Sequence, residues 1–593
     1  MSEEAAAENE ETEGRLYTPK PGERQLTARA IITGCLLGGL VSAMNISFGL
    51  KIGWTVGGSL MAAILGYAAF AVFAKEPPTV LETNITQTTG SAAGTMASAG
   101  GLVAPIPAMF LLGYEIPLWG MFAWVTSVAF LGVFFAVPLR RQYVVIEKLR
   151  FPTGTATANT IVSMFATGAT ALAQARVLLW IALVAGAYSL GSYFIPYMEA
   201  VPLHMLGGVV ATAAAWQFKL YLGPMLFGAG FLIGPRVAVS LLLGAIVSWG
   251  ILAPLSLHYG WVDGPIMSLG SGPRGWILWP GVAIMLADAL TSLALSWKTI
   301  SRTFRFSKDP NEKVDPEAIP NRWWMGGLLC GTILVCTVAK TLFDIPIYMS
   351  LIAVALSSIL AAIAVRSTGE TDINPVGGMG KVTQLVFGGI SPGSMSTNLM
   401  AASISGAGAS QAGDMMQDLK TGHLLGASPR KQLIAQLCGI PAGCIFAVLI
   451  FYLFKSQYEF GGTDYPAPAA FAWKAVAELM SKGFGALPTN AVWGMVGGAI
   501  FGTAMPICKK LFPKSAPYLP SGLAFGIAFI VQAFYSITMF IGLLVYLFWK
   551  KKKPKAAELF VFAVASGLIA GEGLMNIVKG LLTFFKVSPL IGG

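Results

Sequence analysis

Residues 81–101 read LETNITQTTGSAAGTMASAGG, and this stretch decides how the chain must fold. It lies between apolar runs long enough to cross a bilayer, yet it consists of hydroxyls, amides and glycines with one charge, at Glu82. Hydrocarbon offers no partner for such side chains, or for any backbone that the glycines allow to unwind. We therefore predict that the stretch lines a polar interior, as the substrate path of a transport protein does.

The composition is that of a membrane protein. Of 593 residues, 55% are hydrophobic and only 11% are charged, and the mean hydropathy is +0.68. Soluble chains carry about 25% charged residues, so this chain lacks the polar residues to cover a water-facing surface. Apolar runs of spanning length predict an all-α polytopic membrane protein with about 16 transmembrane helices, some of them discontinuous or re-entrant.

The chain divides into two parts that look related. Three short matches recur in the same order and at nearly constant offset. They are Glu82-Thr83-Asn84-Ile85 with Glu370-Thr371-Asp372-Ile373, Gly234-Pro235 with Leu519-Pro520, and Asp288 with Glu572. Such duplication is common in secondary transporters. We predict a disordered cytoplasmic tail at 1–28, a first transmembrane half at 29–297, a cytoplasmic linker at 298–323 and a second transmembrane half at 324–593.

The net charge of +11 does not indicate nucleic-acid binding, because basic residues gather at the ends of apolar runs. This distribution predicts a multi-pass protein of a cell membrane, plasma or bacterial inner, with its N-terminus in the cytoplasm. If the two halves are parallel, Lys550 to Lys553 lie on the outer side of the membrane, contrary to the rule that basic residues gather on the cytoplasmic side. Either a long segment such as 515–549 re-enters the membrane, or the duplication does not preserve topology.

Three acids stand out because they lie in apolar or polar-neutral sequence: Glu82, Asp288 and Glu572. An ionised carboxylate at membrane depth must gain a cationic partner or take up a proton. Proton coupling is the functional interpretation. A structural ion pair for Glu82, and a helix–helix hydrogen bond for the other two, are the alternatives.

A second polar stretch, residues 403–423, carries Asp414 and Asp418. Four residues apart on a helix, they share one face. A buried acid pair tends to hold a proton or a cation. The alternative is an acid pair at a helix end, answered by Lys420 or Arg430 in a cytoplasmic loop.

A third polar stretch runs from Arg150 to Asn159. Pro152 biases Phe151 away from helical geometry, so a helix is expected to start near Thr153 with free N–H groups at its mouth. Such a mouth in a cavity attracts an anion, for example a peptide carboxylate. An ordinary start to a spanning helix is the alternative.

No phosphate-binding loop, zinc motif or nucleophile elbow is present in the sequence. These absences disfavour direct ATP coupling and catalysis. We predict that the protein is not an enzyme and uses neither a cofactor nor a metal site of its own.

The polar stretches resemble the oligopeptide transporter family, and its yellow-stripe-like branch more than its peptide branch. The residues that carry the resemblance are Glu82-Thr83-Asn84, the run Leu149 to Ala158, Gly234-Pro235 with Ser240 to Ala245 and Ser248-Trp249-Gly250, and Met416 to His423. They extend through both halves. The NPG and KIPPR-type signatures of the peptide branch are absent.

The resemblance implies a secondary transporter of small peptides, peptide-like compounds or metal chelates, driven by a proton gradient. On this hypothesis of alternating access, 82–101 and 403–418 face one another across a central cavity. The predicted substrate-binding residues are Glu82, Asn84, Gln87, Thr153, Thr157 and Gln411, and the predicted proton-coupling residues are Glu82, Asp414, Asp418, Asp288 and Glu572.

A passive channel or pore for small polar solutes is the alternative, because glycine-rich broken helices also build selectivity paths. The expected partners are the lipid bilayer and a small peptide or metal chelate, with no nucleic acid. A homo-oligomer is left open.

Overall fold

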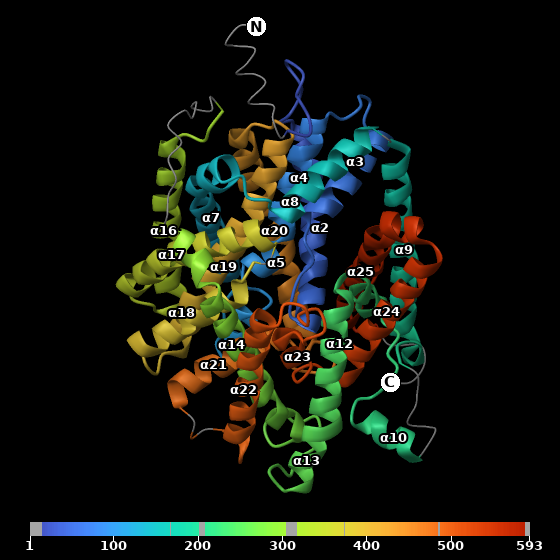
Figure 1. Ribbon diagram of the computed structural model, residues 1–593, viewed down its shortest axis with the longest axis vertical. Coiled ribbons are helices and arrows are strands. Elements are labelled where there is room, and N and C mark those ends of the chain that lie inside the picture. Colours follow the sequence, from blue (N-terminus) through green and yellow to red (C-terminus); the bar gives the residue numbers. More distant parts are fainter. Residues whose placement is uncertain are drawn as a thin grey trace.

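The computed structural model describes residues 15–587, apart from 167, 201–207, 304–316, 373, 484 and 486. The first part of the predicted tail, residues 1–14, and the middle of the predicted linker lie outside the described residues. All named elements of the described chain are helices, which confirms the all-α class (Figure 1). Helices distant in sequence pack together, such as α9 with α25 and α2 with α20, so blue and teal helices lie beside orange and red ones in Figure 1.

The helices of the first 303 residues are α2 (Ala28–Ile52), α3 (Ser59–Phe73), α4 (Val80–Gly94), α5 (Met96–Ala99), α6 (Pro105–Leu111), α7 (Leu118–Arg140), α8 (Pro152–Ala166), α9 (Gly168–Phe194), α10 (Gly208–Ala215), α11 (Pro224–Leu232), α12 (Gly234–Ala245), α13 (Ala253–His258), α14 (Pro273–Leu295) and α15 (Trp297–Thr303). Two π-helical segments, Arg141–Ile146 and Ile246–Leu252, extend α7 and α12, and a 3₁₀ turn lies at Pro196–Met198.

The later helices are α16 (Asn321–Phe343), α17 (Ile347–Thr371), α18 (Val376–Ile390), α19 (Met395–Leu424), α20 (Pro429–Gln457), α21 (Pro468–Lys482), α22 (Ala491–Leu511), α23 (Gly522–Ile527), α24 (Ala533–Lys552) and α25 (Pro554–Phe584).

Eleven helices of the described chain are long and apolar enough to cross a membrane. Large apolar side chains on them face outward, as on α22, where Trp493 is 74% exposed. The remaining segments counted toward about 16 predicted spans are short, broken or polar. The helices α3, α8, α18 and α21 have 15 residues each, fewer than the roughly 20 that a straight span needs.

The stretch that opens at residue 81 forms a broken helix rather than one span. α4 ends at Gly94, α5 is a single turn, and α6 begins at Pro105. Gly101 adopts a left-handed φ of 77° between them, and a Cβ there would lie 2.7 Å from Pro105. The buried amide of Asn45 donates to the Gly94 carbonyl oxygen at 3.1 Å, so backbone freed by the break still has a partner.

Two other long predicted spans are broken as well. The 226–257 segment divides into α11 and α12 at Gly234, which has a φ of 73°. The 515–549 segment divides into the short α23 and the long α24. Apolar composition alone does not reveal these breaks, because every piece is apolar.

Glycines set the closest helix crossings. On α22, a Cβ at Gly498 would lie 2.6 Å from the Pro280 carbonyl oxygen of α14, and one at Gly502 would lie 2.4 Å from that of Ile284. On α25, Gly567 and Gly571 face the α9 backbone in the same way. The small-residue spacing at these positions therefore brings backbones together.

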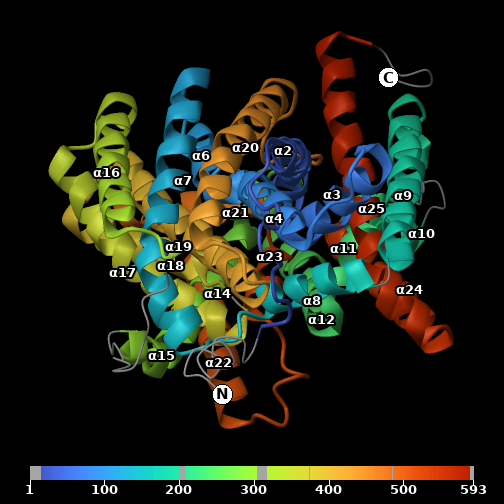
Figure 2. The ribbon, with the colours of Figure 1, turned by 90° about the horizontal axis from the view of Figure 1, so that it is seen from above.

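The centre of the molecule is built by α4 and α19, which run in opposite directions. The segment before α2 contacts both, because the Leu16 amide donates to the Leu424 carbonyl oxygen and Thr27 Oγ1 donates to Glu82 Oε1 at 2.5 Å. The start of α4 and the end of α19 thus lie on the same side. α20 packs on both helices, and α2 packs on α4 (Figures 1 and 2).

We expect Gly498→Ala to destabilise the protein by about 1–3 kcal/mol, because the added methyl group overlaps the α14 backbone. The apparent Tm of the purified protein, followed by size-exclusion chromatography after heating, measures the effect. Gly497→Ala is the matched control, since nothing lies within 4 Å of its Cβ position. An equal Tm for the two variants would contradict the crossing geometry.

Candidate functional site

Every residue of α4 is buried, including its polar ones. Two of its threonines bond within the helix, since Thr86 Oγ1 donates to the Glu82 carbonyl oxygen and Thr89 Oγ1 to that of Ile85. Gln87, Thr88 and Ser91 instead contact side chains of neighbouring helices. These three residues are therefore the ones that can exchange partners.

Asp418 of α19 is the centre of the buried polar network. Its Oδ1 accepts from Gln87 Nε2 at 2.5 Å and from the Ser59 hydroxyl at 3.4 Å, and its Oδ2 accepts from Gln436 Nε2 at 2.6 Å. The side chain is 1% exposed. No lysine or arginine of the described residues forms an ion pair with it, so α3, α4 and α20 supply only neutral donors.

The network can serve Asp418 in either charge state. Ser59 and Ser91 lie 2.8 Å apart, and either hydroxyl can be the donor. A carboxylate only accepts, whereas a protonated carboxyl also donates one hydrogen bond. Reorientation of the Ser59 hydroxyl therefore turns a donor to Asp418 into an acceptor from it without moving a helix.

The network continues along both helices. Gln411 Nε2 donates to Gln436 Oε1 at 3.3 Å, and Thr95 Oγ1 donates to Gln411 Oε1 at 3.4 Å. Of the predicted substrate-binding residues, Gln87 and Gln411 thus join the same network, and Asn84 donates to Gln87 Oε1 at 3.3 Å. The Asn84 Oδ1 atom is buried and has no hydrogen-bond partner among the described residues, which leaves an acceptor for a ligand or a water molecule.

Asp414 lies one turn before Asp418 on α19. It is partly exposed and forms no hydrogen bond with the described residues.

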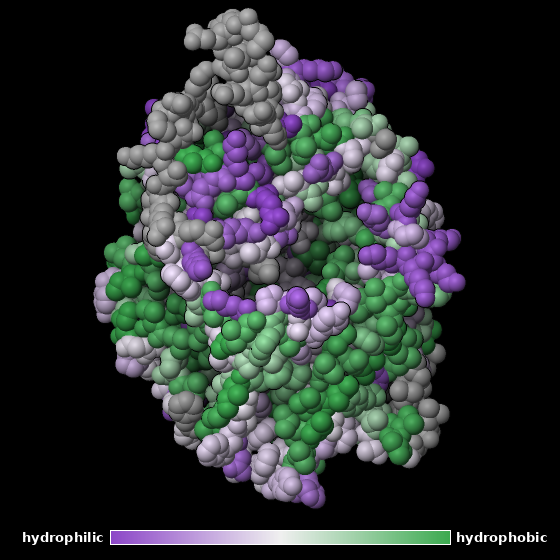
Figure 3. All heavy atoms as spheres, in the orientation of Figure 1, coloured by the Kyte–Doolittle hydropathy of each residue, from purple (hydrophilic) through white to green (hydrophobic). Residues whose placement is uncertain are grey.

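The face drawn in Figure 3 is hollowed near its centre, and hydrophilic residues gather above and beside the hollow. The surface below is largely hydrophobic, as expected for contact with lipid.

Glu82 lies apart from this network, in the first turn of α4. Arg29 of α2 holds both of its oxygens, with Nε at 2.6 Å from Oε1 and Nη2 at 2.5 Å from Oε2. Thr27 adds a third donor. The structure thus provides the ion pair that was the alternative for this residue, while its predicted role in coupling stays a prediction.

The third polar stretch starts α8 at Pro152, and Phe151 has a positive φ of 43°. The N–H groups at the start of α8 donate to side chains of the same protein. Asp372 Oδ1 accepts from the Thr153 amide at 3.0 Å, and Gln417 Oε1 accepts from the Gly154 amide at 2.7 Å. The free N–H groups predicted for an anion are therefore bonded to side chains.

The hydroxyls of this stretch are engaged as well. Thr153 Oγ1 donates to Asp372 Oδ2 at 2.8 Å, and Thr157 Oγ1 donates to the Thr153 carbonyl oxygen at 2.9 Å. The structure does not bring Thr153 or Thr157 into the network around Asp418.

Glu572 of α25 forms a buried ion pair. Lys51 Nζ at the end of α2 lies 2.9 Å from Oε1, and Oε2 accepts from the Met225 amide at 2.8 Å. Met225 is the second residue of α11, so the carboxylate lies at the N-terminus of a short helix. Asp288 of α14 occupies a comparable place beside Gly522, the first residue of α23, and its Oδ1 is buried without a partner.

Several polar residues of these sites were absent from the predicted set: Ser59, Gln436, Lys51 and Asp372. Gln436 lies in a run that reads as an ordinary apolar span, and a neutral amide gives little signal there. Lys51 lies between two adjacent apolar runs and looked like a boundary between spans. As an ionisable residue flanked by apolar sequence on both sides, it could have been found.

A helical membrane protein that buries amides, hydroxyls and carboxylates on broken helices has the architecture of a membrane transporter. The family model described as "OPT oligopeptide transporter protein" matches residues 25–583. The chain belongs to this family, which agrees with the resemblance, and it is a multi-pass membrane transporter rather than an enzyme.

Curated relatives agree over nearly their whole length. The chain is 29% identical to "Putative oligopeptide transporter YGL114W" of Saccharomyces cerevisiae, over 96% of this chain and 97% of the relative. It is 28% identical to "Metal-nicotianamine transporter YSL2" of Arabidopsis thaliana, over 97% of this chain and 95% of the relative. It is also 28% identical to "Probable metal-nicotianamine transporter YSL13" of Oryza sativa, over 100% and 90%.

We expect Arg29→Gln to destabilise the protein by about 3 kcal/mol, because it leaves the fully buried Glu82 carboxylate without its cation. Adding Glu82→Gln should restore part of the loss, and a double-mutant cycle on the apparent Tm measures the coupling.

Arg24→Gln is the matched control for this cycle. Its pair with Glu76 is 40% and 66% exposed, so its loss should change stability by about 1 kcal/mol or less. Additive effects of the Arg29 and Glu82 changes would show that the two side chains do not act as a pair.

Proposed function

We propose that the protein is a proton-coupled secondary transporter that imports small peptide-like compounds or metal chelates by alternating access. The proton gradient is the energy source, and the N-terminus lies in the cytoplasm of a plasma or bacterial inner membrane. The observation that carries the proposal is Asp418, a buried carboxyl group bonded only to neutral donors. Family membership supplies the transport class.

The chemistry of Asp418 favours a proton as the coupling ion. An ionised carboxylate at this depth is costly without a cation, and amides and hydroxyls offset only part of that cost. Protonation removes the charge, and the new carboxyl O–H needs one hydrogen-bond acceptor, which the Ser59 hydroxyl can supply. Asp414, one turn away on the same face, adds like-charge repulsion when both are ionised, and this repulsion further favours one bound proton.

The location of Asp418 links protonation to movement. It joins α19 to α3, α4 and α20 through single hydrogen bonds. Of these helices, α4 ends at the break after Gly94, and a loop that changes the direction of the chain joins α3 to α4. A change in charge at this junction alters which arrangement of the four helices is favoured, as alternating access requires.

The names of the relatives support this substrate class. One is described as an oligopeptide transporter and two as metal-nicotianamine transporters. Peptides and amino-carboxylate chelates share carboxylate and amine nitrogen groups. The amide side chains of Asn84, Gln87 and Gln411 suit such ligands, because each amide both donates and accepts.

The arrangement also supports two related halves, with the second inverted relative to the first. The packing of the two central helices is comparable, because α4 packs on α2 and α20 while α19 packs on α17 and α7. Glu572 of α25 contacts the N-terminus of α11, and Asp288 of α14 lies beside the N-terminus of α23. Each last long helix therefore places an acid at a short helix of the other half.

On this arrangement α16 has no counterpart in the first half, and one extra span inverts the helices that come after it. The boundary between the halves then falls after Phe343 rather than at the predicted 324. The match of Glu82 with Glu370 does not fit it, because Glu82 lies in the first turn of α4 and Glu370 in the last turn of α17.

We expect Asp418→Asn to abolish concentrative uptake while leaving exchange of substrate across the membrane. Asparagine keeps the shape and one acceptor oxygen but cannot take up a proton. Proteoliposomes with an inward proton gradient and labelled Zn²⁺–nicotianamine or trialanine measure accumulation. Counterflow without a gradient measures exchange.

Asp344→Asn serves as the control, because Asp344 is an exposed acid whose partner is Lys340 of the same helix. Accumulation by Asp418→Asn equal to that of the native protein would overturn the coupling role. Flux that does not saturate and never exceeds equilibrium in the native protein would favour the passive channel instead.

A further inference from the structure

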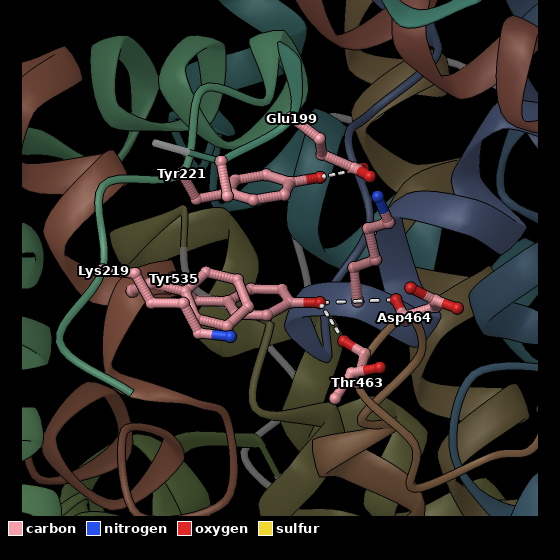
Figure 4. A pocket seen from close by; sticks show the side chains of 9 residues that line it. Glu199, Lys219, Tyr221, Thr463, Asp464 and Tyr535 are labelled. Atoms are coloured by element: carbon pink, nitrogen blue, oxygen red, sulfur yellow. Dashed lines mark hydrogen bonds between the residues drawn. The ribbon is translucent and has the colours of Figure 1, made fainter. Parts of the chain in front are cut away.

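A second polar site lies at the far end of α2. Arg29 and Lys51 are 22 residues apart on this helix, or about 33 Å at 1.5 Å per residue, close to the thickness of a bilayer core. Next to Lys51 is a cavity of about 180 Å³ (Figure 4). The cavity therefore lies toward the membrane surface opposite to the segment that precedes α2.

Two tyrosines form the walls of the cavity. In Figure 4, Tyr221 lies above it and Tyr535 below it. Their rings are nearly parallel, with an interplanar angle of 6° and centroids 6.4 Å apart. Tyr535 OH donates to the carbonyl oxygens of Thr463 and Asp464, at 3.2 and 3.3 Å. These bonds tie the loop before α21 to α24 and keep the shape of the cavity.

Charges of both signs line the same cavity. Lys51 and Lys219 supply two ammonium groups, and Glu199 and Asp464 supply two carboxylates. Tyr221 OH donates to Glu199 Oε1 at 2.9 Å, which orients that carboxylate (Figure 4). Lys51 is paired with Glu572. In the described part of the chain, neither Lys219, Glu199 nor Asp464 forms an ion pair.

Two buried residues outside the lining of the cavity have polar atoms without a hydrogen-bond partner among the described residues. Arg274 of α14 is 4% exposed, and these atoms are its Nε and Nη2. In Gln532, three residues before Tyr535, the atom is Oε1. Buried polar groups are normally bonded, so such a group in a native structure points to a ligand, an ion or water.

We propose that this cavity binds a small ligand carrying both carboxylate and ammonium groups, either a short peptide or an amino-acid-derived metal chelator. Lys219 takes the carboxylate, and Glu199 and Asp464 take the ammonium group. The volume is below the roughly 300–1,000 Å³ of sites for drug-sized molecules, so one end of the ligand enters. The inference rests on the proposed transport function and names an entry site for it.

The test measures equilibrium binding to the purified full-length protein in lipid nanodiscs, at one pH and without a gradient. The probes are trialanine, trialanine amide and Zn²⁺–nicotianamine. Amidation removes the carboxylate, so it should raise the Kd of the native protein about tenfold or more. In Lys219→Gln, trialanine should bind about tenfold more weakly, and amidation should make little further difference.

The ammonium group is tested in the same way. N-acetyl-trialanine should lose affinity for the native protein and lose little more in Glu199→Gln. Lys482→Gln is the matched control, because Lys482 is 50% exposed and lies outside the cavity. A general folding defect would weaken all probes equally, whereas the proposal requires each variant to erase one specific difference between probes.

The probes also distinguish the two sources of ligand. Tighter binding of trialanine supports peptides, and tighter binding of Zn²⁺–nicotianamine, weakened by Lys219→Gln, supports chelators. No saturable binding of any probe, or an unchanged amidation effect in Lys219→Gln, overturns the site. Specific binding with these variant effects but without gradient-driven accumulation overturns proton coupling and leaves the site in place.

Discussion

The need to pair every buried polar group inside the protein shapes this structure more than any other constraint. Lipid offers no hydrogen bonds, and α4 buries all fifteen of its residues. Thr86 and Thr89 bond to their own helix, while Gln87 bonds to Asp418 of α19. The polar side chains of α19, together with Ser59 of α3 and Gln432 of α20, supply the partners that lipid cannot. Asn45 meets the same demand where α4 breaks.

The sequence predicted the elements that carry polar groups at membrane depth. Stretches rich in hydroxyls and amides are rare in apolar surroundings, so 81–101 and 403–423 were recognisable, and the structure places them in direct contact. Their exact partners were not predictable. The ion pair of Arg29 with Glu82 and that of Lys51 with Glu572 join residues 53 and 521 positions apart, and no local pattern encodes such distances. Discontinuous helices were predicted from the sequence, but the exact position of a break such as the one at Gly234 was not.

Short sequence matches proved less informative than the places of single residues in the fold. Glu82-Thr83-Asn84 begins a helix, whereas Glu370-Thr371-Asp372 ends one, with Asp372 in a left-handed conformation at φ 66°. A helix start exposes N–H groups and a helix end exposes C=O groups, so similar sequences make different contacts at these two places. The residues directly beside Asp288 differ from those beside Glu572, yet each acid contacts the N-terminus of a short helix from its own long helix. In the proposed duplication, equivalent residues are therefore identified by the contacts that they make rather than by their neighbours in the sequence.

Three of the buried carboxyl groups, Glu82, Glu572 and Asp418, differ in their partners, and this difference bears on the proposed exchange of protons. Glu82 and Glu572 each contact a cation. Protonating either would leave a buried or half-buried cation without its partner, a loss of about 3–5 kcal/mol for a buried pair. Asp418 has amides and a hydroxyl around it, and none of these becomes an uncompensated charge when a proton binds. Binding a proton therefore breaks no ion pair at Asp418, whereas at Glu82 and Glu572 it would have to compete with the attraction of a cation.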